Sequence, residues 1–207
     1  MPEPESRPAL WSRLSRQQFF LLTGLASLGL LTGCSDSGDS LAQQADEADS
    51  KGYIAGDGSV SEYSQDQRSQ PVSFSGTLFD GSSLDAQSLR GKPVLLNFWY
   101  AGCAPCRAEA PDLVELYQKY GSQVAFYGVN VRDEAGTAQA FERTFKVEYP
   151  SFKDSDGSVL YGLSSFVPAQ AVPTTLLLDK EGRVAARILG QIDPSILKTI
   201  LEEQIRA

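Results

Sequence analysis

The sequence predicts a mixed α/β domain, in which helices cover both faces of a central sheet, over residues 71–207. Three apolar runs of strand length, at 94–100, 124–130 and 174–179, are separated by segments with helical periodicity. Continuous apolar runs of this length are typical of strands buried on both faces. A last strand and an amphipathic helix close the domain, and this order of elements indicates a mixed sheet between helical layers.

The domain is expected to begin with an N-terminal hairpin extension. Short extended segments at 73–78 and 82–84 flank Asp80-Gly81, a dipeptide that favours a tight turn between two strands. The buried strand at 94–100 follows this hairpin and leads directly to Cys103. The first cysteine of the domain is therefore expected at the end of a central strand.

The remaining elements follow from helix signals and turns. The helical pattern after Cys103 contains Pro111, where a kink is expected. A second helix is predicted at 137–145. A strand at 183–188 follows the third buried run, and Asp193-Pro194 supplies a cap and a first-turn proline for the closing helix.

Composition excludes several classes of site and partner. The chain has 207 residues and no histidine, which removes Ser-His-Asp and Cys-His catalysis and most zinc sites. Its formal charge of -8 argues against nucleic acid or an anionic membrane surface as a partner of the folded part. The three cysteines, Cys34, Cys103 and Cys106, are too few for a tetrahedral cysteine site. Arg107 follows the close pair where a c-type haem attachment motif has histidine.

The first 34 residues have the pattern of an export signal. Arg7, Arg13 and Arg16 precede an apolar run at 19–31, which is shorter than the roughly 20 residues of a transmembrane helix. The run ends in Leu-Thr-Gly-Cys34, which resembles a bacterial lipobox. This resemblance implies that residues 1–34 are a lipoprotein signal peptide and that Cys34 is lipidated. The alternative is an ordinary secretory signal with a chance cysteine.

Residues 35–70 are expected to form a flexible tether between the lipid anchor and the domain. They are rich in Ser, Asp, Gly and Gln and poor in large apolar side chains. A segment of this composition cannot bury enough apolar surface to offset the entropy of ordering its chain. The predicted organisation is thus a signal peptide, a tether, and a domain at 71–207.

Cys103 and Cys106 have the spacing of a redox-active pair. A cysteine at the start of a helix lies near free backbone N–H groups and a partial positive charge, which together stabilise a thiolate. The pKa of the Cys103 thiol is therefore expected to fall below its ordinary value of about 8.5. The three-residue spacing lets the second sulfur reach the first across one helical turn. Cys103 is expected to be the attacking sulfur and Cys106 the resolving one.

Three motifs resemble those of the TlpA/ResA/DsbE group of thioredoxin-fold oxidoreductases. They are the active-site segment at 94–111, the L-x-G-K lead-in at 88–93, and the Val-Pro-Thr-Thr loop at 172–175. The resemblance implies a thioredoxin-like fold and a lipid-anchored position on the extracytoplasmic face of a bacterial membrane. It also implies exchange with thiols of exported proteins, apocytochrome c among them, and a membrane thiol–disulfide electron carrier as a second partner. No cofactor beyond the Cys103–Cys106 disulfide is expected.

The same resemblance assigns roles to three further residues. Pro173 should follow a cis peptide bond, and the backbone of Val172 should pair with a substrate peptide. Glu109 occupies the position of an active-site carboxylate, for which proton transfer with the Cys106 sulfur is the implied role. Gly102 departs from the group's pattern because a tryptophan usually precedes the first cysteine. Asn97 stands where thioredoxin itself has a buried aspartate.

Other functions on a similar fold remain open at this point. A peroxiredoxin-like (AhpC/TSA-type) peroxidase would carry threonine where this chain has Tyr100. A non-catalytic binding module, such as a copper carrier, would use histidine or methionine partners, but Met1 is the one methionine and histidine is absent. A thioredoxin-like scaffold would not need an intact Cys-x-x-Cys pair.

Overall fold

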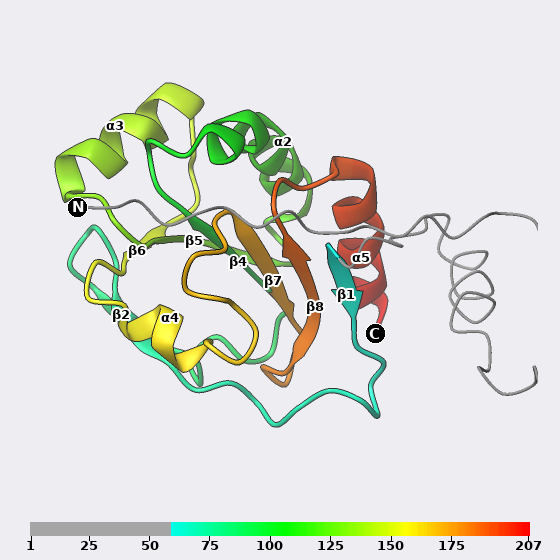
Figure 1. Ribbon diagram of the computed structural model, residues 1–207. Coiled ribbons are helices and arrows are strands. Elements are labelled where there is room, and N and C mark those ends of the chain that lie inside the picture. Colours follow the sequence, from blue (N-terminus) through cyan, green and yellow to red (C-terminus); the bar gives the residue numbers. More distant parts are fainter. Residues whose placement is uncertain (1–58) are drawn as a thin grey trace, which may run out of the picture. The chain divides into compact units, whose positions relative to one another are not determined.

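The computed structural model describes residues 59–207 (Figure 1). The predicted signal peptide with Cys34, and residues 35–58 of the predicted tether, lie outside the described residues. Within residues 59–207, no helix is long and apolar enough to cross a membrane.

A six-stranded mixed sheet forms the centre of the domain, in the order β1-β8-β7-β4-β5-β6. The strands are β1 (Val60–Glu62), β4 (Val94–Trp99), β5 (Ala125–Asn130), β6 (Ser151–Lys153), β7 (Thr174–Leu178) and β8 (Val184–Leu189). The central strand β4 pairs in parallel with β5 and antiparallel with β7. All six residues of β4 are buried, as the continuous apolar run predicts.

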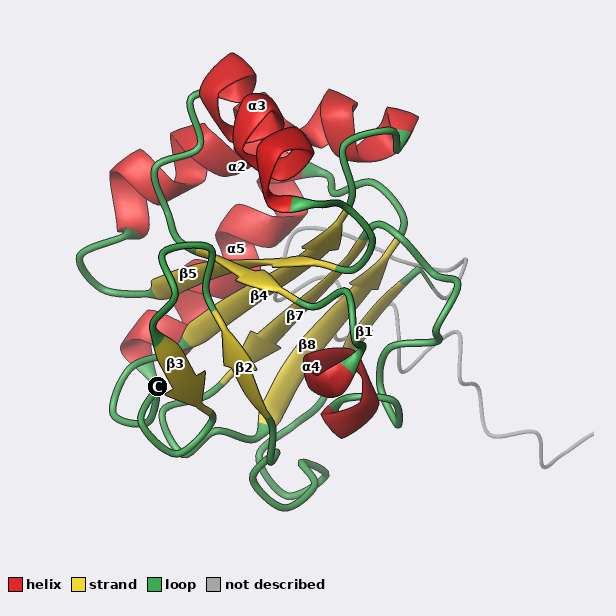
Figure 2. Cartoon of the chain, turned by 90° about the vertical axis from the view of Figure 1, so that its left-hand side faces the viewer, coloured by secondary structure: helices red, strands yellow, loops and turns green. Residues whose placement is uncertain are grey.

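Helices cover one face of the sheet, and a hairpin with a short helix covers the other (Figure 2). The helices are α2 (Ala104–Tyr120), α3 (Ala135–Phe145), α4 (Ser158–Gly162) and α5 (Pro194–Arg206). Alternate side chains of β4 divide between two cores, because successive residues of a strand point to opposite faces. Leu95 packs with α2 and α5, whereas Leu96 and Phe98 pack with the hairpin and α4. The predicted mixed sheet, flanked by helices, is confirmed.

The predicted N-terminal hairpin is confirmed as β2 (Ser75–Thr77) paired with β3 (Ser83–Asp85). Gly81 turns the chain with φ +88°, a conformation that glycine adopts without strain. The hairpin lies against the sheet, because a Cβ at Gly76 would meet side-chain atoms of Val159 and Phe152 within 3 Å. This close approach explains why glycine is found inside so short a strand.

Three elements were not predicted from the sequence: β1, β6 and α4. Each has five residues or fewer, too short to show a period. The strand β1 falls within the segment assigned to the tether, yet it pairs antiparallel with β8. Arg68 then forms an ion pair with Asp179 at 3.0 Å, and both side chains are 5% exposed. Residues 59–70 therefore pack on the domain, whose structured part begins before residue 71.

The closing helix α5 begins as the sequence predicts. Asp193 is its N-cap and accepts hydrogen bonds from the backbone N–H groups of Ser195 and Ile196. Pro194 occupies the first turn, where its missing N–H costs no helical hydrogen bond. The apolar side of α5 covers the same face of the sheet as α2.

Candidate active site

Cys103 and Cys106 form a disulfide where β4 ends and α2 begins. Cys103 is the N-cap of α2, and its sulfur accepts a hydrogen bond from the backbone N–H of Cys106 at 3.2 Å. Pro105 lies in the first turn, where proline is tolerated. An N–H donor and the positive end of a helix both favour negative charge at this sulfur. After reduction, the site would therefore stabilise a thiolate on Cys103.

The loop before β7 lies opposite the disulfide. The Val172–Pro173 peptide bond is cis, as the resemblance implies. The carbonyl oxygen of Val172 lies 4.0 Å from the sulfur of Cys103. The N–H of Val172 donates instead to the carbonyl of Gln170 at 3.2 Å. The carbonyl, not the N–H, is thus the backbone group that Val172 directs towards the reacting sulfur.

Glu109 lies one helical turn after Cys106 and is fully buried (0% exposed). Its two carboxylate oxygens accept from different donors: Oε1 from the Asn97 side-chain amide at 2.8 Å and Oε2 from the Ile192 N–H at 2.9 Å. Burial disfavours the charged form and raises the pKa of Glu109 to about 7, against these two hydrogen bonds, which lower it. A carboxyl group with this pKa can take up and release a proton near neutral pH.

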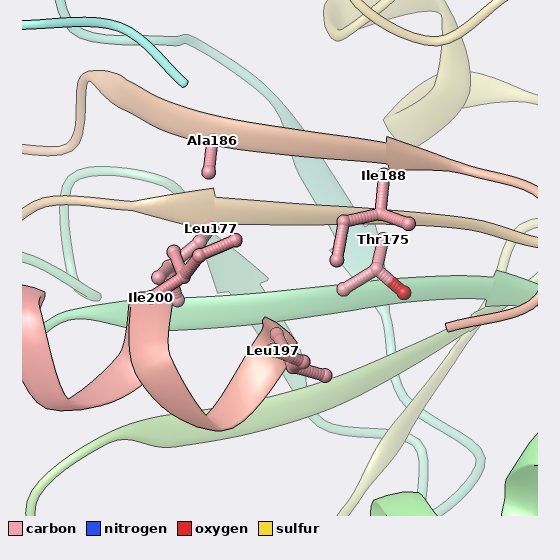
Figure 3. Close-up of a pocket in the computed structure, with 6 residues that line it drawn as sticks. All are labelled: Thr175, Leu177, Ala186, Ile188, Leu197 and Ile200. Atoms are coloured by element: carbon pink, nitrogen blue, oxygen red, sulfur yellow. The ribbon is translucent and has the colours of Figure 1, made fainter. Parts of the chain in front are cut away.

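A narrow, mostly apolar space lies next to Thr175, which is bonded to a hydrogen-bond partner of Glu109. The amide of Asn97 also donates to the Thr175 hydroxyl at 3.1 Å. Figure 3 shows Thr175 at one end of a space between β7, β8 and α5. The other lining side chains are aliphatic: Leu177, Ala186, Ile188, Leu197 and Ile200. Thr175 thus joins the hydrogen-bond network of Glu109 to the apolar core beneath β7 and β8.

Asp133 holds the loop that carries Cys103, a role the sequence analysis did not assign. Its Oδ2 accepts hydrogen bonds from the Ala101 backbone N–H, at 2.6 Å, and from the Asn130 side-chain amide, at 2.9 Å. Asn130 is fully buried at the end of β5, and its own Oδ1 accepts the Asp133 N–H at 2.7 Å. The sequence signal for this role is weak: two polar residues, Asn130 and Asp133, stand at the end of a buried strand and just after it.

We expect Asp133→Ala to slow disulfide exchange by roughly tenfold, because the Ala101 N–H loses its partner and the loop before Cys103 is freed. Asp133→Asn should retain most of the rate, because one amide oxygen can accept both hydrogen bonds. The measurement is the rate of exchange with a dithiol, with thermal unfolding as the check on folding. Asp156→Ala is the matched control, since Asp156 also accepts a backbone N–H, but that of Ser158 and not one in the loop before Cys103. Equal rates for Asp133→Ala and the wild type would contradict this role.

The structure brings together five of the six residues singled out from the sequence. Cys103, Cys106, Glu109, Val172 and Pro173 lie around the start of α2, and Cys34 is outside the described residues. The ring of Trp99 packs on Phe141 with centroids 4.3 Å apart, which makes it a core aromatic beside the site.

The sequence is similar to a protein family and to several thiol-disulfide oxidoreductases. The AhpC/TSA family model matches residues 69–187. The thiol-disulfide oxidoreductase ResA of Bacillus cereus is 30% identical over 128 residues, which is 61% of this chain and 72% of that protein. ResA of Geobacillus thermodenitrificans is 37% identical over 116 residues, or 55% of this chain and 63% of that protein.

Two solved structures are similar across most of their length. A DsbF homologue from Corynebacterium diphtheriae has a TM-score of 0.63 and 32% identity, and the match covers 73% of this chain and 96% of that one. A secreted thiol-disulfide isomerase from Corynebacterium glutamicum has a TM-score of 0.65 and 28% identity, covering 75% and 97%. The chain therefore belongs to the AhpC/TSA family, has a thioredoxin-like fold, and is a thiol–disulfide oxidoreductase of the ResA/DsbE type.

Proposed function

We propose that the protein is tethered to the extracytoplasmic face of a bacterial membrane, where its Cys103–Cys106 pair exchanges disulfides with thiols of exported proteins. The observation that carries the proposal is the disulfide at the N-terminus of α2, opposite the cis Val172–Pro173 bond. Residues 1–34, with a charged segment, an apolar run and the lipobox at Cys34, support the location.

The exchange proceeds in two displacements. In the reducing direction the Cys103 thiolate attacks a substrate disulfide, a bond forms between the two sulfurs, and one substrate sulfur leaves as a thiolate. Glu109 takes the proton from Cys106, whose thiolate then attacks Cys103 and releases the second substrate sulfur. Two electrons pass to the substrate, and the protein's disulfide forms. The two substrate thiolates take up one proton from Glu109 and one from solvent, which replaces the proton that Cys103 released on ionising. The oxidising direction follows the same steps in reverse, so no further cofactor is required.

The partners follow from this chemistry and location. Apocytochrome c, an exported protein with paired cysteines, is the substrate we propose to test first. A membrane thiol–disulfide electron carrier would return the Cys103–Cys106 pair to its starting state. The peroxidase alternative receives no support at Tyr100, whose ring packs against Arg132 and which supplies no threonine hydroxyl at that position.

The test uses the reduced full-length protein, freed of reductant and mixed with apocytochrome c that contains a disulfide. Acid quenching and alkylation would count the thiols on each protein over time. We expect apocytochrome thiols to form at the rate at which the Cys103–Cys106 disulfide forms. Oxidation of the protein that leaves the apocytochrome disulfide intact would contradict this substrate.

Lipidation of Cys34 has its own test. We expect the mature protein to begin at Cys34, to carry a diacylglyceryl mass, and to sediment with membranes, because a lipid thioether supplies a large apolar anchor. Cys34→Ser should release the protein from the membrane fraction without changing its exchange rate in detergent. Mass spectrometry of the mature N-terminus and fractionation are the measurements. An unlipidated N-terminus in the wild type would refute the anchor.

A further inference from the structure

Two arginines contact the loop that leads to Cys103. The Arg132 guanidinium lies over the ring of Tyr100, with its carbon 4.0 Å from the ring centroid. The Arg107 guanidinium donates to the Ala101 carbonyl at 3.4 Å and lies 5.1 Å from the centroid of Phe145. Both arginines are exposed. Contact with a ring helps to hold each planar guanidinium in place, and both side chains remain accessible to solvent.

Among residues 59–207, no carboxylate forms an ion pair with either arginine. Within residues 59–207, the ion pairs involve other cations: Arg68, Lys153 and Arg183. Asp133 follows Arg132, but its Oδ2 is already bonded to the Ala101 N–H and to Asn130. Glu134 lies 3.5 Å from Lys153. The chain as a whole carries a net charge of -8. The positive charge of these two arginines near the disulfide is therefore opposite in sign to the net charge of the protein.

One exposed strip of the loop before Cys103, at Gly102, carries no side chain. Gly102 is exposed, and a Cβ there would make only ordinary contacts, the nearest being 3.7 Å from the ring of Tyr100. A side chain would therefore fit at Gly102, and its absence leaves this position of the loop open to an approaching chain. An extended substrate segment can approach this strip without displacing a bulky residue.

We propose that Arg107 and Arg132 bind carboxylates that flank the reacting cysteine of a polypeptide substrate. This inference rests on the proposed exchange function and adds the chemistry of the partner. Guanidinium groups bind carboxylates with two parallel hydrogen bonds, and groups held in position lose little freedom on binding. A local positive charge also raises the encounter rate with an acidic segment, an effect that salt weakens.

The test compares two peptides that contain one disulfide each and differ only at the positions next to the reacting cysteine. The acidic peptide has Asp and Glu there, and the neutral peptide has Asn and Gln. The reduced full-length protein is mixed with each peptide, and the second-order rate constant is measured from low to high NaCl. We expect the acidic peptide to react about tenfold faster at low salt, since two exposed pairs each contribute up to about a factor of five. High salt should remove most of the difference.

The double variant Arg107→Gln with Arg132→Gln should lose this preference, so that its rate constants for the two peptides become equal. The matched control is Arg90→Gln with Lys92→Gln, which removes two exposed charges just before the other end of β4. The control should keep the preference. Equal rates for the two peptides with the wild-type protein would overturn the inference and leave the exchange function intact, whereas no reaction with either peptide would count against the exchange function itself.

An anionic membrane surface is the other partner that the two arginines could bind, and the same variants test whether they do. Vesicles that contain phosphatidylglycerol serve as the probe, with sedimentation as the measurement. If the double variant loses vesicle binding while its preference for the acidic peptide is unchanged, the two arginines serve lipid contact and the polypeptide inference is wrong. If vesicle binding is equal in the wild type and the variant, and the variant has lost its preference for the acidic peptide, the polypeptide inference is supported.

Discussion

Replacing Cys103 with serine is expected to abolish disulfide reduction, with a loss of at least about a thousandfold in the rate of insulin reduction, as removal of a nucleophile does in other enzymes. A serine hydroxyl does not ionise near neutral pH and forms no disulfide. We expect Cys106 not to take over the attack, because Cys103 is the N-cap of α2 and its sulfur is the one that accepts a backbone N–H at the helix start. Insulin turbidity with a dithiol as the electron donor measures the rate.

The control for this variant is Cys34→Ser, which leaves the Cys103–Cys106 pair in place and should reduce insulin as fast as the wild type in detergent. Thermal unfolding of the reduced proteins would show that Cys103→Ser is folded. An insulin reduction rate that Cys103→Ser shares with the wild type would remove the assigned nucleophile.

Glu109→Gln is expected to slow exchange by about a hundredfold near pH 7 and to remove a titration from its pH profile, because general acid–base groups contribute at least this much. Glutamine carries no titratable proton, so Cys106 loses its acceptor. An amide nitrogen also has no lone pair for a hydrogen bond, so one of the donors from Asn97 and Ile192 is left unpaired. The measurement is alkylation of the reduced protein across pH 5–9.

The same carboxyl group makes stability depend on pH. Burial raises the pKa of Glu109 from 4.5 to about 7, so the folded state binds this proton more tightly than the unfolded state. The free energy of unfolding should therefore fall as pH rises through this interval, by up to about 3 kcal/mol. Glu109→Gln should flatten this slope, whereas Glu115→Gln, an exposed change on the same helix, should leave both slope and thiol titration unaltered. An unchanged thiol titration in Glu109→Gln would refute the proton-transfer role.

Local sequence signals were sufficient for the elements that present the disulfide. The apolar run of β4, the Cys-x-x-Cys spacing and the cap at Asp193 each act over a few residues, and each is found as predicted. The cis bond before Pro173 was inferred from a motif, since nothing in neighbouring residues requires it. The short elements β1, β6 and α4 escaped detection because no period can be read over three to five residues, whereas the equally short strands of the hairpin are marked by Asp80-Gly81.

Contacts between distant segments could not be predicted. Asp133 reaches the backbone of Ala101 across 32 positions, and Ile192 binds Glu109 across 83. The sequence places Glu109 on the same helix as the cysteines, but its hydrogen-bond partners come from β4 and from the segment between β8 and α5. The two arginines next to the loop before Cys103 likewise come from separate segments, Arg107 from α2 and Arg132 from the segment between β5 and α3. Tertiary packing, not local pattern, sets the electrostatics of the site.

The most direct test of the assigned roles of Cys103 and Cys106 is to trap the mixed disulfide between Cys103 and a substrate. Cys106→Ser removes the resolving sulfur, so a substrate that joins Cys103 cannot be released by the second displacement. Full-length Cys106→Ser, mixed with a disulfide-containing substrate and quenched with acid, should carry the substrate on Cys103 in peptide mass spectrometry, and Cys103→Ser should carry none there. Absence of the adduct on Cys103, with the variant folded and its thiol reduced, would contradict the assignment of Cys103 and Cys106 as the working pair.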